Sequence, residues 1–177
     1  VKGRHLEVNK MRLENRIAVI TGATGGLGRV VAQRLAESGA RLALVSSSGE
    51  KLAALEGELN SPPDRRFSIA ADLSQPEAAQ GVFDAVIARF GRADMLLHFV
   101  GGWIGGTPVA QVAADDVATM LQQHLWTTFH LTQAFVPHLL EPAGLVIPGF
   151  LDLVRPVLEA GAEDGLMFRG EGNDLHK

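Results

Sequence analysis

The sequence of 177 residues contains no cysteine and no tyrosine, and its only lysines are Lys2, Lys10, Lys51 and Lys177. The lack of cysteine excludes disulfides, thiolate metal ligands and a cysteine nucleophile. The lack of tyrosine, and of lysine between positions 51 and 177, removes two side chains that commonly donate or accept protons in catalysis.

Basic runs and long apolar runs are also absent. The formal net charge is −4, so nothing favours a nucleic acid or an anionic membrane as partner. There is no secretory h-region and no apolar run long enough to span a bilayer. With 46% hydrophobic residues, the length suits one globular domain with a real core. We therefore expect a cytoplasmic protein that binds neither nucleic acid nor membrane.

The most informative stretch joins an apolar run, 17–20, to a helical pattern through a glycine-rich turn. Four glycines occupy that turn: Gly22, Gly25, Gly26 and Gly28. Free N–H groups and the helix dipole favour a phosphate at such a turn. Gly22 would make the turn, Gly26 would admit a pyrophosphate, and Gly28 would let helix and strand pack closely. No Gly-Lys-Ser/Thr ending follows, so the turn is not a mononucleotide P-loop. The alternative is a strand–helix loop that only requires glycine.

Strand and helix patterns alternate along the chain, which predicts an α/β fold with a Rossmann-like, doubly wound parallel sheet. The expected strands cover 16–21, 41–46, 67–70 and 94–100, with a short fifth at 145–147. The expected helices cover 26–38, a segment capped by Ser47 with Glu50, a segment opened by Ser74 with Glu77, and about 115–140. The first and fourth strands are then neighbours, so the glycine-rich loops 22–28 and 101–106 line one crevice.

The domain boundaries follow from these patterns. Residues 1–10 are polar, lack periodicity and precede Met11, so we expect a tag or disordered leader. We expect the dinucleotide-binding domain at 11–147. Residues 148–177, with a weak helix at 151–160, would be a short C-terminal remnant with little order.

Several separated motifs, over roughly 13–140, resemble the short-chain dehydrogenase/reductase family. Thr21-Gly22-x-x-x-Gly26-x-Gly28 is similar to the family's cofactor loop, and Asp72-Leu73-Ser74 to its adenine-contacting segment. Segments 94–101 and 132–139 resemble its Asp-x-Leu-x-Asn-Asn-Ala-Gly motif and the end of its interface helix. The resemblance implies an oxidoreductase that binds a nicotinamide dinucleotide, acts on a small carbonyl or alcohol, and self-associates through the helix at 115–140. The implied cofactor contacts are Thr21, Gly22, Thr24, Gly25, Gly26, Leu27, Gly28, Ser46, Ser47, Asp72, Leu73, His98, Val100 and Gly101.

The departures from the family concern catalysis. His98 and Phe99 replace the paired asparagines, and His124 falls where the family has a proton-relay asparagine. After Gly144 the family's serine strand and Tyr-x-x-x-Lys helix should follow, but the chain runs directly into a Pro-Gly turn, as if the fold were truncated after the fifth strand. The resemblance therefore implies cofactor binding with hydride transfer impaired or lost. His124 is the candidate acid, and a purely structural role is its alternative.

The expected cofactor is NADP or NAD. Ser46, Ser47 and Ser48 stand where an acidic residue would bind the ribose of NAD, and hydroxyl groups at a helix N-terminus favour the extra phosphate of NADP. Two other hypotheses remain: a non-catalytic dinucleotide-binding or interaction protein, and a truncated form of an intact NADP-dependent reductase. We expect no metal site, because His124, His130 and His138 lack the four-residue spacing that puts two ligands on one helix face.

Overall fold

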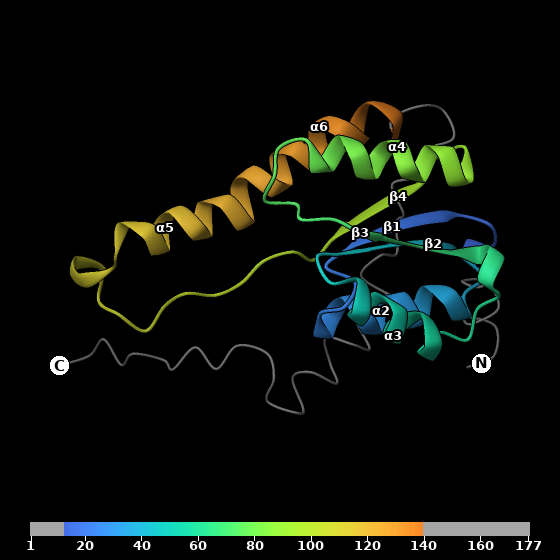
Figure 1. The fold of residues 1–177 in the computed structure, drawn as a ribbon, viewed down its shortest axis with the longest axis horizontal. Helices are drawn as coiled ribbons and strands as arrows, with labels where there is room; N and C mark the ends of the chain where they lie inside the picture. The colour runs from blue at the N-terminus through green and yellow to red at the C-terminus, as the bar shows by residue number, and fades with distance from the viewer. Residues whose placement is uncertain (1–12, 140–177) are drawn as a thin grey trace, which may run out of the picture. The chain divides into compact units, whose positions relative to one another are not determined.

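The computed structural model describes residues 13–139, which contain a parallel four-stranded sheet (Figure 1). The strands are β1 (Ile17–Thr21), β2 (Arg41–Ser46), β3 (Arg66–Ala70) and β4 (Met95–His98). Their order is β3-β2-β1-β4, and every pair is parallel. The α/β, Rossmann-like prediction is thus confirmed, including the expected contact between the first and fourth strands.

Helices cover both faces of the sheet. Figure 1 shows α2 (Gly26–Glu37) and α3 (Gly49–Glu58) on one face, and α4 (Ala78–Phe90) and α6 (Thr127–Leu139) on the other. Short 3₁₀ turns occupy Pro63–Arg65 and Val109–Gln111. This layering explains why the central strands are apolar without alternation: all five residues of β1 are buried.

The core lies between the sheet and its helices. Phe83 of α4 and Phe135 of α6 meet edge to face, with their ring centroids 5.2 Å apart, beneath Val19 and Val45 of the sheet. On the opposite face, Leu35 of α2 is fully buried. Consecutive strand residues point to opposite faces, so each central strand contributes to both layers.

Two helix starts differ from the sequence-based predictions. The N-cap of α3 is Ser48, not Ser47, and its side chain accepts a hydrogen bond from the Lys51 N–H at 3.3 Å. The predicted capping box at Ser74 is also wrong, because α4 begins at Ala78 without a side-chain cap. The N–H of Ser74 instead donates to the Asp72 carboxylate at 3.0 Å, so this segment forms a turn before the helix.

The predicted long helix forms from α5 (Ala114–Leu121) through α6, with a π-helical turn, Gln122–Trp126, between them. No residue of α5 is buried, and Figure 1 shows this helix extending beyond the sheet. The sequence pattern did not predict the π-helical turn. Such turns accommodate one additional residue and change which side chains face a neighbour.

Asp94 holds the starts of β1 and β4 together. It is only 3% exposed, and its two carboxylate oxygens accept hydrogen bonds from Arg16 at 3.0 Å, Arg92 at 3.1 Å and the backbone N–H of Ile17 at 2.8 Å. The carboxylate thus accepts a hydrogen bond from the first backbone N–H of β1.

Some expectations fall outside the described residues: the leader at 1–10, the fifth strand at 145–147, the helix at 151–160 and the remnant at 148–177. Within residues 13–139, no helix is both long enough and apolar enough to cross a membrane.

We predict that Asp94→Asn lowers the free energy of unfolding by about 2 kcal/mol, because it weakens charge-assisted hydrogen bonds at a buried position. The measurement is urea unfolding followed by circular dichroism. Glu37→Gln is the matched control, since Glu37 pairs with Arg34 on the exposed surface of α2, and its loss should change the stability by less than about 0.5 kcal/mol. Equal effects of the two changes would contradict the role assigned to Asp94.

Candidate functional site

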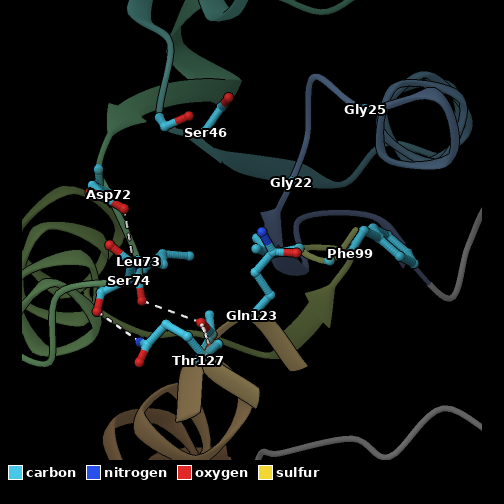
Figure 2. Close-up of a pocket in the computed structure, with 14 residues that line it drawn as sticks. Gly22, Gly25, Ser46, Asp72, Leu73, Ser74, Phe99, Gln123 and Thr127 are labelled. Atoms are coloured by element: carbon cyan, nitrogen blue, oxygen red, sulfur yellow. Dashed lines mark hydrogen bonds between the residues drawn. The ribbon is translucent and has the colours of Figure 1, made fainter. Parts of the chain in front are cut away.

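A pocket of about 360 Å³ lies where the carboxyl ends of all four strands meet the π-helical turn (Figure 2). Four segments that are distant in the sequence form its walls: the glycine-rich turn after β1 and the residues that follow β2, β3 and β4. Gln122, Gln123 and Thr127 of the long helix close the remaining side. The lining residues are Gly22, Gly25, Ser46, Ser47, Ala71, Asp72, Leu73, Ser74, Phe99, Val100, Gly101, Gln122, Gln123 and Thr127.

The glycine-rich turn depends on its missing side chains. Gly22 has φ +69°, and a Cβ there would lie 2.7 Å from the carbonyl carbon of Phe99. A Cβ at Gly28 would collide with the carbonyl oxygen of Gly22. At Gly26 a Cβ would meet nothing within 4 Å, so the first turn of α2 faces open space. A turn with positive φ at glycine, a close helix contact and a bare helix N-terminus are the features that let an anion approach backbone N–H groups.

Hydroxyl groups line the side of the pocket formed by β2. The hydroxyls of Ser46 and Thr24 lie 2.7 Å apart, and this hydrogen bond joins the glycine-rich turn to the end of β2. The adjacent Ser47 also lines the pocket. This wall therefore offers neutral polar groups at the end of β2, where an acidic residue would favour NAD over NADP.

Asp72 supplies the only charged side chain among the lining residues that the structure describes. Hydrogen bonds from the side chain and backbone N–H of Ser74 hold the pKa of Asp72 below its usual value. Asp72 is thus a carboxylate at neutral pH and can accept hydrogen bonds from a ligand.

The long helix is fixed to the segment that follows β3. Gln122 donates from Nε2 to the carbonyl oxygen of Ser74 at 2.8 Å, and Thr127 donates to that of Leu73 at 3.4 Å (Figure 2). These two bonds lie at either end of the π-helical turn, so they hold this turn next to Asp72.

His98 and His124 are not among the residues that line the pocket. His98 joins the ends of β1 and β4, and His124 contacts the loop after β4. Nδ1 of His98 shares a 2.6 Å hydrogen bond with the hydroxyl of buried Thr21, while its Nε2 is buried and has no hydrogen-bond partner among the residues that the structure describes. Burial, assisted by the nearby His124, lowers the pKa of His98. Exposed His124 donates from Nε2 to the carbonyl oxygen of Gly102 at 2.8 Å. In residues 13–139, no three histidine or carboxylate side chains are grouped to hold a metal ion.

The structure brings most of the predicted site residues together, in two layers. Those that line the pocket directly are Gly22, Gly25, Ser46, Ser47, Asp72, Leu73, Val100 and Gly101. Thr21, Thr24, Gly26, Leu27, Gly28 and His98 adjoin the pocket along the β1–α2 turn and the end of β4, and His124 contacts the loop after β4.

Sequence reasoning missed six lining residues: Ala71, Ser74, Phe99, Gln122, Gln123 and Thr127. The polarity of Gln122 and Gln123 was an available signal, because these residues interrupt an otherwise apolar helix immediately before His124. Their placement at the pocket also depends on the π-helical turn, which the pattern did not predict.

Comparisons with known proteins agree with this geometry. The short chain dehydrogenase family matches residues 16–148. A curated relative, 1-deoxy-11-beta-hydroxypentalenate dehydrogenase from Streptomyces avermitilis, is 33% identical over 74% of this chain and 49% of its own length. The chain thus spans about half the length of the curated relatives it matches.

Solved structures show the same fold. A metagenomic short-chain oxidoreductase in complex with NADP has a TM-score of 0.66 and 31% identity, covering 72% of this chain and 57% of that one. The 3-ketoacyl-(acyl-carrier-protein) reductase from Brucella melitensis, complexed with NADH, has a TM-score of 0.65 and 25% identity over 72% and 51%. With the motif order, the strand order and the family match in agreement, the chain belongs to the short chain dehydrogenase family.

Proposed function

We propose that this chain binds a nicotinamide dinucleotide, NADP or NAD, in the pocket at the carboxyl ends of its strands. One observation carries the proposal: the first turn of α2 presents bare backbone beside Gly26, which faces open space at the topological switch point between β1 and β4. The NADP and NADH in the two related solved structures support the choice of ligand.

The residues present fit such a ligand. The backbone N–H groups at the start of α2 would bind the diphosphate, and Asp72 and Leu73 would contact the adenine. Val100 and Gly101 would lie along the nicotinamide half. Ser46 and Ser47 favour NADP over NAD, because two hydroxyls and no carboxylate line the wall after β2.

The proposed activity class is an oxidoreductase of the short-chain type that is impaired in hydride transfer. A bound nicotinamide supplies the hydride, and the carbonyl oxygen of the substrate then requires a proton donor within hydrogen-bond reach. This sequence contains no tyrosine and no lysine between positions 51 and 177. His124 already donates to Gly102 and lies outside the pocket. Loss of general acid–base assistance lowers a rate by about 10²–10⁴-fold.

Two alternatives share the same pocket. The chain could serve as a non-catalytic dinucleotide-binding or interaction protein, or it could be a truncated form of an intact NADP-dependent reductase. Both alternatives are motivated by the absence of tyrosine and by the absence of lysine between positions 51 and 177. An intact mass of the expressed protein, together with resequencing of its coding DNA beyond Gly144, separates truncation from a natural short form.

We also propose that two copies of the chain associate through the long helix. Leu121, Leu125, Trp126 and Phe129 are each about half exposed along it. Large apolar side chains exposed along one helix favour an interface between two copies.

Gly26→Val should weaken binding of NADPH and NADH by at least about tenfold, because the side chain fills the space in front of the α2 N-terminus. Titration with cofactor fluorescence measures this. Gly81→Val is the matched control, since Gly81 is also a helical glycine whose Cβ would meet nothing within 4 Å, and it lies in α4 away from the pocket. If the Gly26 variant bound as tightly as the wild type, the glycine-rich turn would not be the binding site.

For catalysis, we expect clear cofactor binding with very slow or undetectable turnover of NADPH and NADH against a panel of aldehydes, ketones and quinones. His124→Ala should leave this result unchanged. Robust turnover that His124→Ala abolishes would identify this histidine as the acid and overturn the impaired-enzyme proposal. Robust turnover in both proteins would place the active site elsewhere.

For assembly, light scattering at micromolar concentrations should give a mass above that of the monomer. Leu125→Lys should shift the mass toward the monomer, because it places a charge on the apolar surface of the helix. Val109→Lys is the control at a 91% exposed position outside the long helix. A wild-type protein that stays monomeric would contradict the interface.

A further inference from the structure

Among the described residues, 13–139, those that line the pocket include no cationic side chain to neutralise a diphosphate. Asp72 is the only charged one of them, and the rest are neutral. An anionic ligand therefore depends on backbone N–H groups and on neutral side-chain donors. Only donors that are not already engaged in hydrogen bonds within the protein can serve such a ligand.

Several lining side chains already donate or share hydrogen bonds within the protein. The hydroxyl of Ser46 pairs with that of Thr24, Gln122 donates to Ser74, and Thr127 donates to the carbonyl oxygens of Leu73 and Gln122. Gln123 differs from these residues. Within residues 13–139, no protein group accepts a hydrogen bond from its amide nitrogen.

The two ends of the Gln123 amide have different surroundings. Its Oε1 is buried against Gly102, where a Cβ would lie only 2.7 Å away, and no donor from the described part of the chain reaches this oxygen. Figure 2 shows the side chain extending from the helix wall toward Gly22, with its nitrogen directed at the glycine-rich turn. The amide thus faces the turn across the pocket and offers a donor there.

The backbone around Gln123 is held in place. The hydrogen bonds of Gln122 and Thr127 fix the π-helical turn on both sides of this residue. Gly102 leaves room for the amide because it has no side chain. A donor that is positioned before the ligand arrives loses little conformational entropy on binding.

We propose that Gln123 binds the diphosphate of the dinucleotide, donating a hydrogen bond from Nε2 to a phosphate oxygen from the wall opposite the Gly22 turn. This inference rests on the proposed dinucleotide binding and adds a second, neutral contact on the far side of the diphosphate. Gln123 is then an affinity determinant for diphosphate-containing ligands.

The test compares NADPH, ADP and adenosine by isothermal titration calorimetry with the wild type, Gln123→Met and Gln123→Glu. Gln123→Met keeps the length of the side chain and removes the donor, so affinity for NADPH and ADP should fall about tenfold or more, while adenosine binding stays unchanged. Gln123→Glu should weaken NADPH and ADP further, because a carboxylate repels the diphosphate. Gln80→Met, the same change on the exposed surface of α4, should alter nothing.

Unchanged NADPH affinity in Gln123→Met, beside a wild type that binds, would overturn the role of Gln123 and leave the proposed function intact. An equal loss for adenosine and ADP would also overturn it, because the contact would then be with the nucleoside. The role of Gln123 would also be overturned if Gln123→Glu bound NADPH as tightly as Gln123→Met does. A wild type that binds none of the three ligands would remove the proposed function itself. Thermal unfolding of each variant separates loss of binding from loss of fold.

Discussion

The contact between the Gly22 turn and the backbone of Phe99 is the constraint on which the site depends. A side chain at Gly22 would overlap this backbone, so β1 and β4 are able to end side by side only because the residue is glycine. That proximity places the first turn of α2 beside the loop that follows β4. Gly22, Phe99 and Val100 then line the pocket together.

The same pair of strands is held at both ends, by different chemistry. At the start, the buried carboxylate of Asp94 joins Arg16, Arg92 and the first N–H of β1. At the other end, Thr21 and His98 share one hydrogen bond between registered residues of β1 and β4. The lowered pKa of His98 keeps it neutral at neutral pH. Below its unfolded pKa of about 6.5, the unfolded chain binds this proton first, so the contribution of His98 to stability declines as the pH falls.

Binding and catalysis make different demands on this chain. The pocket needs a bare helix N-terminus, hydroxyls and amides, and the described residues supply them. Hydride transfer also needs a proton donor. Beside the pocket, His98 is hydrogen-bonded to Thr21 and His124 is hydrogen-bonded to the carbonyl oxygen of Gly102. The fold alone does not determine which chemistry the site performs.

The sequence by itself determined the strand–helix alternation, the neighbouring first and fourth strands, and the roles of Gly22 and Gly28, because hydrophobic periodicity and glycine requirements are local and strong. Most of the predicted pocket residues follow from the same topology. Only the tertiary structure decided that Ser48 caps α3, that His98 bonds to Thr21, and that a π-helical turn brings Gln123 to the pocket. The Thr21–His98 bond and the placement of Gln123 depend on contacts between segments distant in the chain, which no local pattern encodes. The Ser48 cap is local, but neighbouring Ser47 and Ser48 are equally good N-caps by sequence, so the pattern did not choose between them.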